Sequence, residues 1–197
     1  MRARAYHHGD LRSALLAEAQ STLRTSGLDG LSLRELARAV GVSHAAPRRH
    51  FPDKAALLEA LVSDGFQRLG SALEAAVASE RREFDDVLDE VALAYVRFAT
   101  ANPPLTDLMS QSRFLSDASE QLVVAREASF APVRKMVEAG QAAGVFAQGD
   151  TVRLGTVIFG MLHGLASMVN NGMVDPTDED LTHDAARILL RGLRSGS

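Results

Sequence analysis

Apolar residues recur at the spacing of α-helices along nearly the whole of this chain. Runs that alternate β-branched and polar residues, the pattern typical of strands, are absent, and aromatic residues make up only 5% of the sequence. Glycine, proline and capping residues divide the helical stretches at short intervals. The pattern therefore predicts an all-α protein of about nine helices.

The residues from 31 to 54 form the most informative stretch. Ser32 followed by Glu35 is a capping box, which predicts where a helix starts. One buried face follows at the spacing i, i+3, i+4 and i+7, and Gly41 then supplies the left-handed backbone that ends a helix. Ser43 is placed to cap a second helix running roughly to Phe51. Together these features predict a helix-turn-helix, whose second helix enters the major groove of DNA.

The second helix of this motif is expected to present short side chains first and basic ones later. Its exposed residues would be His44, Ala45, Ala46, Arg48, Arg49 and His50. Short side chains allow a deep approach to a groove, and arginine and histidine suit phosphates and base edges. Pro47 lacks the N–H that would bond the carbonyl of Ser43, so the helix is expected to begin loosely.

The distribution of charge agrees with a small nucleic-acid-binding module. The whole chain of 197 residues has a net charge of −4. Residues 1–54 hold nine Lys and Arg against five Asp and Glu, a net charge of +4, so the remainder carries −8. A basic module on an acidic body can bind phosphates locally.

Composition also restricts the chemistry. The chain has no cysteine, which excludes a disulfide, a thiolate nucleophile or a cysteine-ligated metal and suits a cytoplasmic protein. The longest apolar stretch, residues 154–169, is shorter than the roughly 20 residues of a membrane span. We expect it to be a buried helix of a soluble protein.

Three segments resemble the TetR family of one-component regulators. The first is His50-Phe51-Pro52-Asp53-Lys54, which follows the predicted motif as it does in that family. The second, Tyr6-His7-His8-Gly9-Asp10-Leu11-Arg12, is also similar to many members. The third, His163-Gly164-Leu165-Ala166, resembles a subgroup with a His-Gly motif in its C-terminal domain. The strong match covers about residues 7–65. Pro47 and Arg48 replace the apolar residue and the tyrosine that are usual in the family.

The resemblance implies a domain organisation and a set of DNA contacts. Residues 1–54 would form a three-helix DNA-binding domain, and residues 55–197 an effector-binding and dimerisation domain whose last two helices build a homodimer. Ser32, Ser43, His50 and Lys54 would contact the DNA backbone, and Arg48 would take the tyrosine's phosphate-facing place. His44, Ala45 and Ala46 would meet base edges, with Arg49 at the edge of the groove.

The resemblance further implies a ligand-responsive regulator, typically a repressor, that a small-molecule effector releases from a two-fold-symmetric operator. A ligand cavity is expected at Phe98, Met109, Phe114, Phe130, Phe159 and His163, although a stripe of Phe and Met is also typical of an ordinary core. The alternative is a metal-dependent helical hydrolase using His183-Asp184, with His163 as a further ligand. We expect no enzymatic activity, no cofactor and no metal.

Overall fold

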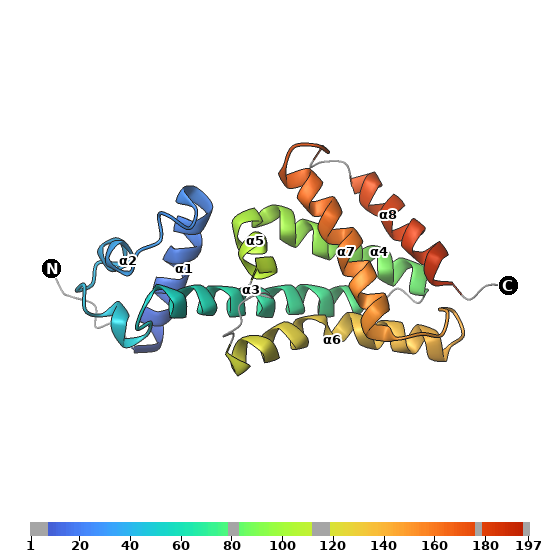
Figure 1. The fold of residues 1–197 in the computed structure, drawn as a ribbon, viewed down its shortest axis with the longest axis horizontal. Helices are drawn as coiled ribbons and strands as arrows, with labels where there is room; N and C mark the ends of the chain where they lie inside the picture. The colour runs from blue at the N-terminus through green and yellow to red at the C-terminus, as the bar shows by residue number, and fades with distance from the viewer. Residues whose placement is uncertain (1–7, 79–82, 112–118, 176–178, 195–197) are drawn as a thin grey trace. The chain divides into compact units, whose positions relative to one another are not determined.

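The computed structural model describes residues 8–78, 83–111, 119–175 and 179–194, and these residues form helices joined by short turns (Figure 1). The all-α prediction is confirmed. The elements are α1 (His8–Ser26), α2 (Leu33–Val40), the 3-10 helix η1 (Pro47–Arg49), α3 (Lys54–Val77), α4 (Phe84–Ala101), α5 (Pro103–Gln111), α6 (Glu120–Ala142), α7 (Thr151–Asn170) and α8 (Glu179–Leu193). In the described ranges there are thus eight α-helices, and η1 takes the place of a ninth.

The chain divides into two compact units. Unit 1 consists of Met1–Gly65 with Pro104–Leu122, and unit 2 consists of Phe66–Pro103 with Val123–Ser197. The predicted division of the sequence after residue 54 stays a prediction.

The core of unit 1 follows the helical spacing of the sequence. On α1 the residues Leu15, Ala19 and Leu23 are buried, four positions apart on one face. They belong to the same core as Leu36 and Ala37 of α2, which packs against α1. The small side chain of Ala37 permits a close approach of the two helices.

Unit 2 is organised around α4, which packs against both α7 and α8. Its apolar face is buried along its length, from Val87 to Ala99. Polar pairs flank the contact between α4 and α8: Asp85 with Arg194, Asp89 with His183, and Arg97 with Glu179.

The apolar helix α7 is less buried than the sequence suggests. Its buried residues are Ile158, Leu162 and Ala166, which lie on one face, while Val157 is 61% exposed. The expectation of a buried helix is therefore wrong for most of its surface. By length and composition α7 is the one described helix that could cross a membrane, which is weak evidence because a helix of a protein core passes the same test.

The last helix, α8, has one buried face and one exposed face. Ala185 and Leu189 are buried, whereas Ile188 is 61% exposed and Gly192 is also exposed. Ile188 is therefore the position for testing the outer surface of α8.

Candidate nucleic-acid interface and ligand pocket

The first helix of the predicted motif begins where the sequence places it. Ser32 has an extended backbone (φ −145°, ψ 132°) and is the N-cap of α2. The side-chain bonds of a capping box are not formed, however: Ser32 makes no capping hydrogen bond, and Glu35 pairs with Arg38 at 2.5 Å. An ion pair one turn along the exposed helix face thus replaces the bond from Glu35 back to the cap.

The turn of the motif is confirmed at Gly41. Its φ of 77° and ψ of 31° are left-handed, a conformation that a side chain disfavours. The N–H of Gly41 donates to the carbonyl of Arg38 at 3.2 Å, and the N–H of Val42 donates to that of Ala37 at 2.9 Å. These two bonds form a Schellman motif, which satisfies the last carbonyls of α2 and redirects the chain.

The second helix of the motif is not an α-helix, so the predicted helix from Ser43 to Phe51 is wrong. Residues 44–46 form a turn, and only Pro47–Arg49 are helical, in the 3-10 conformation. The cause is Pro47, which cannot donate to the carbonyl of Ser43. The N–H of Ala46 uses that carbonyl at 2.9 Å, and the N–H of Arg49 then donates to the carbonyl of Ala46 at 3.2 Å.

The segment from Ser43 to His50 nevertheless presents most of the predicted DNA-binding side chains. Pro47 is buried and anchors the segment. Exposed are Ser43, His44, Ala45, Arg48 and Arg49, whereas Ala46, His50 and Ser32 are half-buried. Two adjacent, exposed guanidinium groups can therefore reach phosphates or guanine edges.

The segment is fixed to the start of α3 and to α1. Phe51 is buried, and the guanidinium carbon of Arg12 lies 5.4 Å from the centre of its ring. Asp53 is the cap of α3, since its Oδ1 accepts a hydrogen bond of 2.8 Å from the N–H of Ala56. These contacts hold the exposed basic residues on a rigid support.

Lys54 has a structural partner in addition to its predicted phosphate contact. Its Nζ donates a hydrogen bond of 2.7 Å to the carbonyl oxygen of Leu28, in the turn between α1 and α2. We expect Lys54→Ala to lower the free energy of unfolding by about 1 kcal/mol through loss of this bond. Urea denaturation measures the effect, with Arg34→Ala, an exposed residue of α2, as the control. An unchanged stability in Lys54→Ala would mean that the bond contributes nothing in solution.

Three of the six predicted ligand-binding residues lie together in unit 2. The ring of Phe159 makes edge contacts with those of Phe130 and Tyr95, with centroids 5.3 and 5.5 Å apart, and stacks on that of His163 at 5.4 Å. The Tyr95 hydroxyl and His163 Nδ1 share a hydrogen bond of 3.0 Å. The aromatic residues therefore form one cluster with a single polar pair at its edge.

A pocket adjoins this aromatic cluster. Its lining is almost wholly apolar: Leu73, Val91, Tyr95, Phe130, Val133, Gly155, Ile158, Phe159 and Leu162. The empty space, including the part open to solvent, is about 270 Å³. We call it the aromatic pocket. Its chemistry suits a small apolar molecule.

The remaining predicted ligand residues lie elsewhere or outside the described residues. Phe98 is half-buried on α4 and does not line the aromatic pocket. Met109 is buried in unit 1, beside Gly65. Phe114 lies outside the described residues. Tyr95 was missed, because a lone tyrosine on an apolar helix face gives no signal of its partner across the fold.

The pair proposed for a hydrolase is divided between separate contacts. His183 Nδ1 lies 2.5 Å from Asp89 Oδ2 on α4, and Asp184 Oδ1 lies 2.5 Å from Nη2 of Arg187. Within the described residues no three His, Cys, Asp or Glu side chains converge as metal ligands would. The contacts therefore do not favour the hydrolase alternative.

A basic segment on a helix-turn-helix scaffold, combined with a second helical unit, defines a helical transcriptional regulator. Sequence comparison agrees: the model of the family described as bacterial regulatory proteins, tetR family, matches residues 15–61. The model described as tetracyclin repressor-like, C-terminal domain, matches residues 88–193, more than half of the chain. The protein belongs to the TetR family of transcriptional regulators. Its assignment to the subgroup with the His-Gly motif stays a prediction.

Individual proteins are similar to this chain over nearly all of it or over about half of it. A protein of unknown function from Rhodococcus sp. RHA1 is 43% identical, with a TM-score of 0.89 over 98% of this chain and 100% of its own. The TetR family transcriptional regulator PfmR from Thermus thermophilus is 25% identical, with a TM-score of 0.70 over 94% of this chain and 98% of its own. The nucleoid occlusion factor SlmA of Haemophilus ducreyi is 34% identical over 96 residues, which are 48% of this chain and 46% of that protein. The match thus spans about half the length of the curated relative.

Proposed function

We propose that the protein is a cytoplasmic, ligand-responsive repressor that binds a two-fold-symmetric operator as a homodimer and leaves it when a small-molecule effector binds. The observation that carries this proposal is the exposed basic segment 43–50, held on α2 by Gly41 and Pro47. The other parts of the proposal rest on the outer surface of α7 and on the aromatic pocket.

The DNA contacts are proposed as follows. Ser32, Ser43, His50 and Lys54 contact the phosphate backbone, and His44, Ala45 and Ala46 approach the bases. Arg48 and Arg49 are additional candidates for base contacts, because both side chains are exposed on the short 3-10 helix η1. The net charge of +4 over residues 1–54 attracts DNA to this part of the chain.

The homodimer is proposed to form through α7 and α8. Val157, Gly160, Gly164 and Met168 follow each other along one exposed face of α7, and a Cβ atom added at either glycine would meet no atom within 4 Å. Ile188 is exposed on α8. Apolar and small residues on adjacent helices allow two copies to approach closely, as in a four-helix bundle.

Effector control is proposed to act through the aromatic pocket. Its lining comes from α3, α4, α6 and α7, so a bound molecule would change how α7 packs on the other three helices. If α7 forms the dimer interface, the spacing of the two DNA-binding units depends on that packing. A ligand that favours one spacing changes operator affinity by the ratio of its affinities for the two states.

The proposed function is tested by recovering genomic DNA fragments with the purified protein and measuring gel shifts on the enriched sequences. We expect a short inverted repeat to be enriched and to bind far more tightly than unrelated DNA at physiological salt. Addition of candidate small apolar molecules should then release it. Equal binding to all fragments would contradict the assignment as an operator-specific regulator.

Gly155 offers a direct test of the aromatic pocket. It lines the pocket, and a Cβ atom added there meets no atom within 4 Å. Gly155→Leu should fill the space and leave a repressor that no longer responds to the effector found above, with operator affinity retained. Gly155→Ala is the control, and it should be stabilised by up to about 1 kcal/mol through helix propensity while responding normally. A normal response in Gly155→Leu would place the effector elsewhere.

A further inference from the structure

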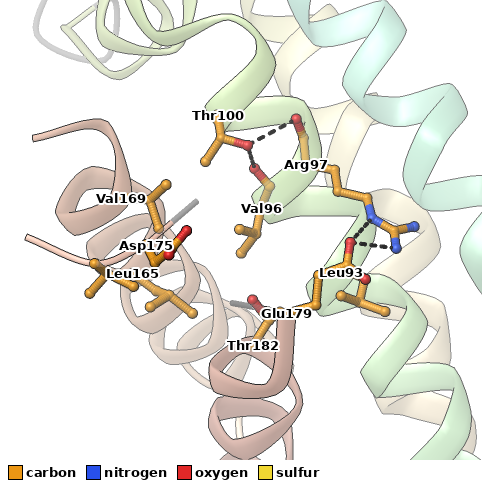
Figure 2. A pocket seen from close by; sticks show the side chains of 10 residues that line it. Leu93, Val96, Arg97, Thr100, Leu165, Val169, Asp175, Glu179 and Thr182 are labelled. Carbon is orange, nitrogen blue, oxygen red and sulfur yellow. Dashed lines mark hydrogen bonds and ion pairs between the residues drawn. The ribbon is translucent and has the colours of Figure 1, made fainter. Parts of the chain in front are cut away.

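Several arginines of this chain pair with carboxylates, and Arg97 is an example. Its Nε and Nη2 both donate to Oε1 of Glu179, at 3.0 and 2.8 Å, as the dashed lines in Figure 2 show. Arg12, an exposed residue of α1, is held differently. Among the residues that the structure describes no carboxylate pairs with it, and its guanidinium carbon lies 5.4 Å from the centre of the Phe51 ring. An aromatic ring therefore takes the place of a counter-ion.

The two kinds of contact use the guanidinium group in different ways. A carboxylate accepts hydrogen bonds and so occupies the N–H groups, whereas the face of a ring attracts the positive charge without accepting such a bond. Phe51 is only 2% exposed, so its ring is a fixed support for a side chain that itself reaches solvent. Arg12 thus presents its charge and its donors, in a defined position, to a group from outside the chain.

The Phe51 ring places Arg12 next to the proposed phosphate contacts. Phe51 directly follows His50 and lies three residues before Lys54. The carboxylate nearest to this ring along the chain, that of Asp53, already accepts a backbone N–H at the start of α3, at 2.8 Å. In a complex with DNA, the anion within reach of Arg12 would therefore be a phosphate, to which an arginine can donate a bidentate pair of hydrogen bonds.

We propose that Arg12 binds a phosphate of the DNA backbone beside the phosphates contacted by His50 and Lys54, and that the Phe51 ring positions it there. This role rests on the proposed function, and it extends the DNA-binding surface from α2 and the segment 43–50 to α1. The contact is independent of sequence, so it strengthens binding to every duplex and fixes the position of the segment 43–50 on its groove.

The salt dependence of DNA binding tests the role of Arg12. Fluorescence anisotropy of the full chain is measured at several salt concentrations, on the inverted repeat recovered from genomic DNA and on a duplex of unrelated sequence. Arg12→Gln removes the charge and keeps a long side chain. We expect it to reduce the slope of log K against log salt by about 0.9 per bound chain on both duplexes. Affinity at low salt should fall about tenfold.

Three further variants distinguish a phosphate contact from support of the fold. Arg24→Gln removes an exposed arginine at the other end of α1, so it matches the change in net charge and should leave the slope unchanged. Arg12→Lys keeps the charge and should restore the wild-type slope with part of the affinity. In Phe51→Leu, which removes the ring and keeps an apolar side chain, Arg12→Gln should cost only about two-fold.

Two outcomes would overturn the phosphate contact. One is a wild-type slope in Arg12→Gln, together with a lower thermal midpoint, which would mean that Arg12 only stabilises the packing of Phe51. The other is an equal change of slope in Arg24→Gln, which would reduce the effect to net charge. A wild-type protein that binds both duplexes equally would instead contradict the proposed function, and the unrelated duplex would still report on Arg12.

Discussion

Gly164→Arg is expected to convert the protein from dimers into monomers and to lower its operator affinity by about 100-fold or more. The glycine is exposed on α7, one turn from Gly160, so in the proposed dimer a long charged side chain at this position would enter the interface. A monomer would bind one half-site alone and lose the effective concentration that links the two, an effect worth about 10²–10⁴ in affinity. Sedimentation equilibrium and gel shifts on the same operator measure both consequences.

Two further variants distinguish a broken interface from a damaged fold. Ile188→Arg places the same charge on the exposed surface of α8 and should also produce monomers. Val124→Arg replaces a valine that is 60% exposed on α6 and should remain dimeric with normal operator affinity. A wild-type protein that is monomeric at micromolar concentration would contradict the proposed dimer directly.

Replacing Arg48 and Arg49 together by alanine is expected to lower operator affinity by about 100-fold at low salt. Both side chains are exposed, and buried Pro47 fixes the backbone beneath them. An arginine that forks onto guanine contributes about 1–3 kcal/mol of discrimination, and one on a phosphate reduces the slope of log K against log salt by about 0.9. The single variants show which role each residue has.

The two roles are separated by a series of single base-pair changes in the operator, measured at several salt concentrations. A base-reading arginine loses affinity at one position of each half-site when replaced, and a phosphate-binding arginine loses it uniformly with a shallower salt slope. His44→Ala is measured alongside, because the TetR resemblance assigns base contact to His44. If His44→Ala alone changes the preferred bases, the two arginines contact only the phosphate backbone of the DNA.

The helix boundaries could be predicted because they depend on local backbone chemistry. Gly27 and Gly41 have left-handed φ angles, of 65° and 77°, after the helices that they end. Asp150 accepts a hydrogen bond from the N–H of Val152 at the start of α7. The second helix of the motif was the exception, although Pro47 indicated a loose start. Proline lacks a backbone N–H and so removes one hydrogen bond of the helix. Whether the chain then continues as an α-helix or as a 3-10 turn depends on the tertiary packing of that proline.

The candidate sites were only partly predictable, because periodicity identifies an apolar face without identifying its neighbour. Phe130 and Phe159 were chosen as apolar helix residues and do meet, but Met109 has the same pattern and is buried in unit 1. Similarly, the apolar residues of α7 were read as core, although Val157 and Met168 are exposed. Periodicity also gives no sign of the contact between Arg97 and Glu179, because these two residues lie 82 positions apart in sequence.

The three polar pairs between α4 and α8 limit how unit 2 can rearrange. They join residue 85 to 194, residue 89 to 183 and residue 97 to 179, so they span most of both helices. The two exposed ion pairs, Asp85 with Arg194 and Arg97 with Glu179, are each worth at most about 1 kcal/mol, but sliding α8 by one turn would break them together with the contact between Asp89 and His183. The same helix α4 contributes Val91 and Tyr95 to the aromatic pocket. A displacement of α4 by a bound molecule would therefore move α8 with it as one rigid unit, and the proposed dimer surface would tilt without changing its register along the helix.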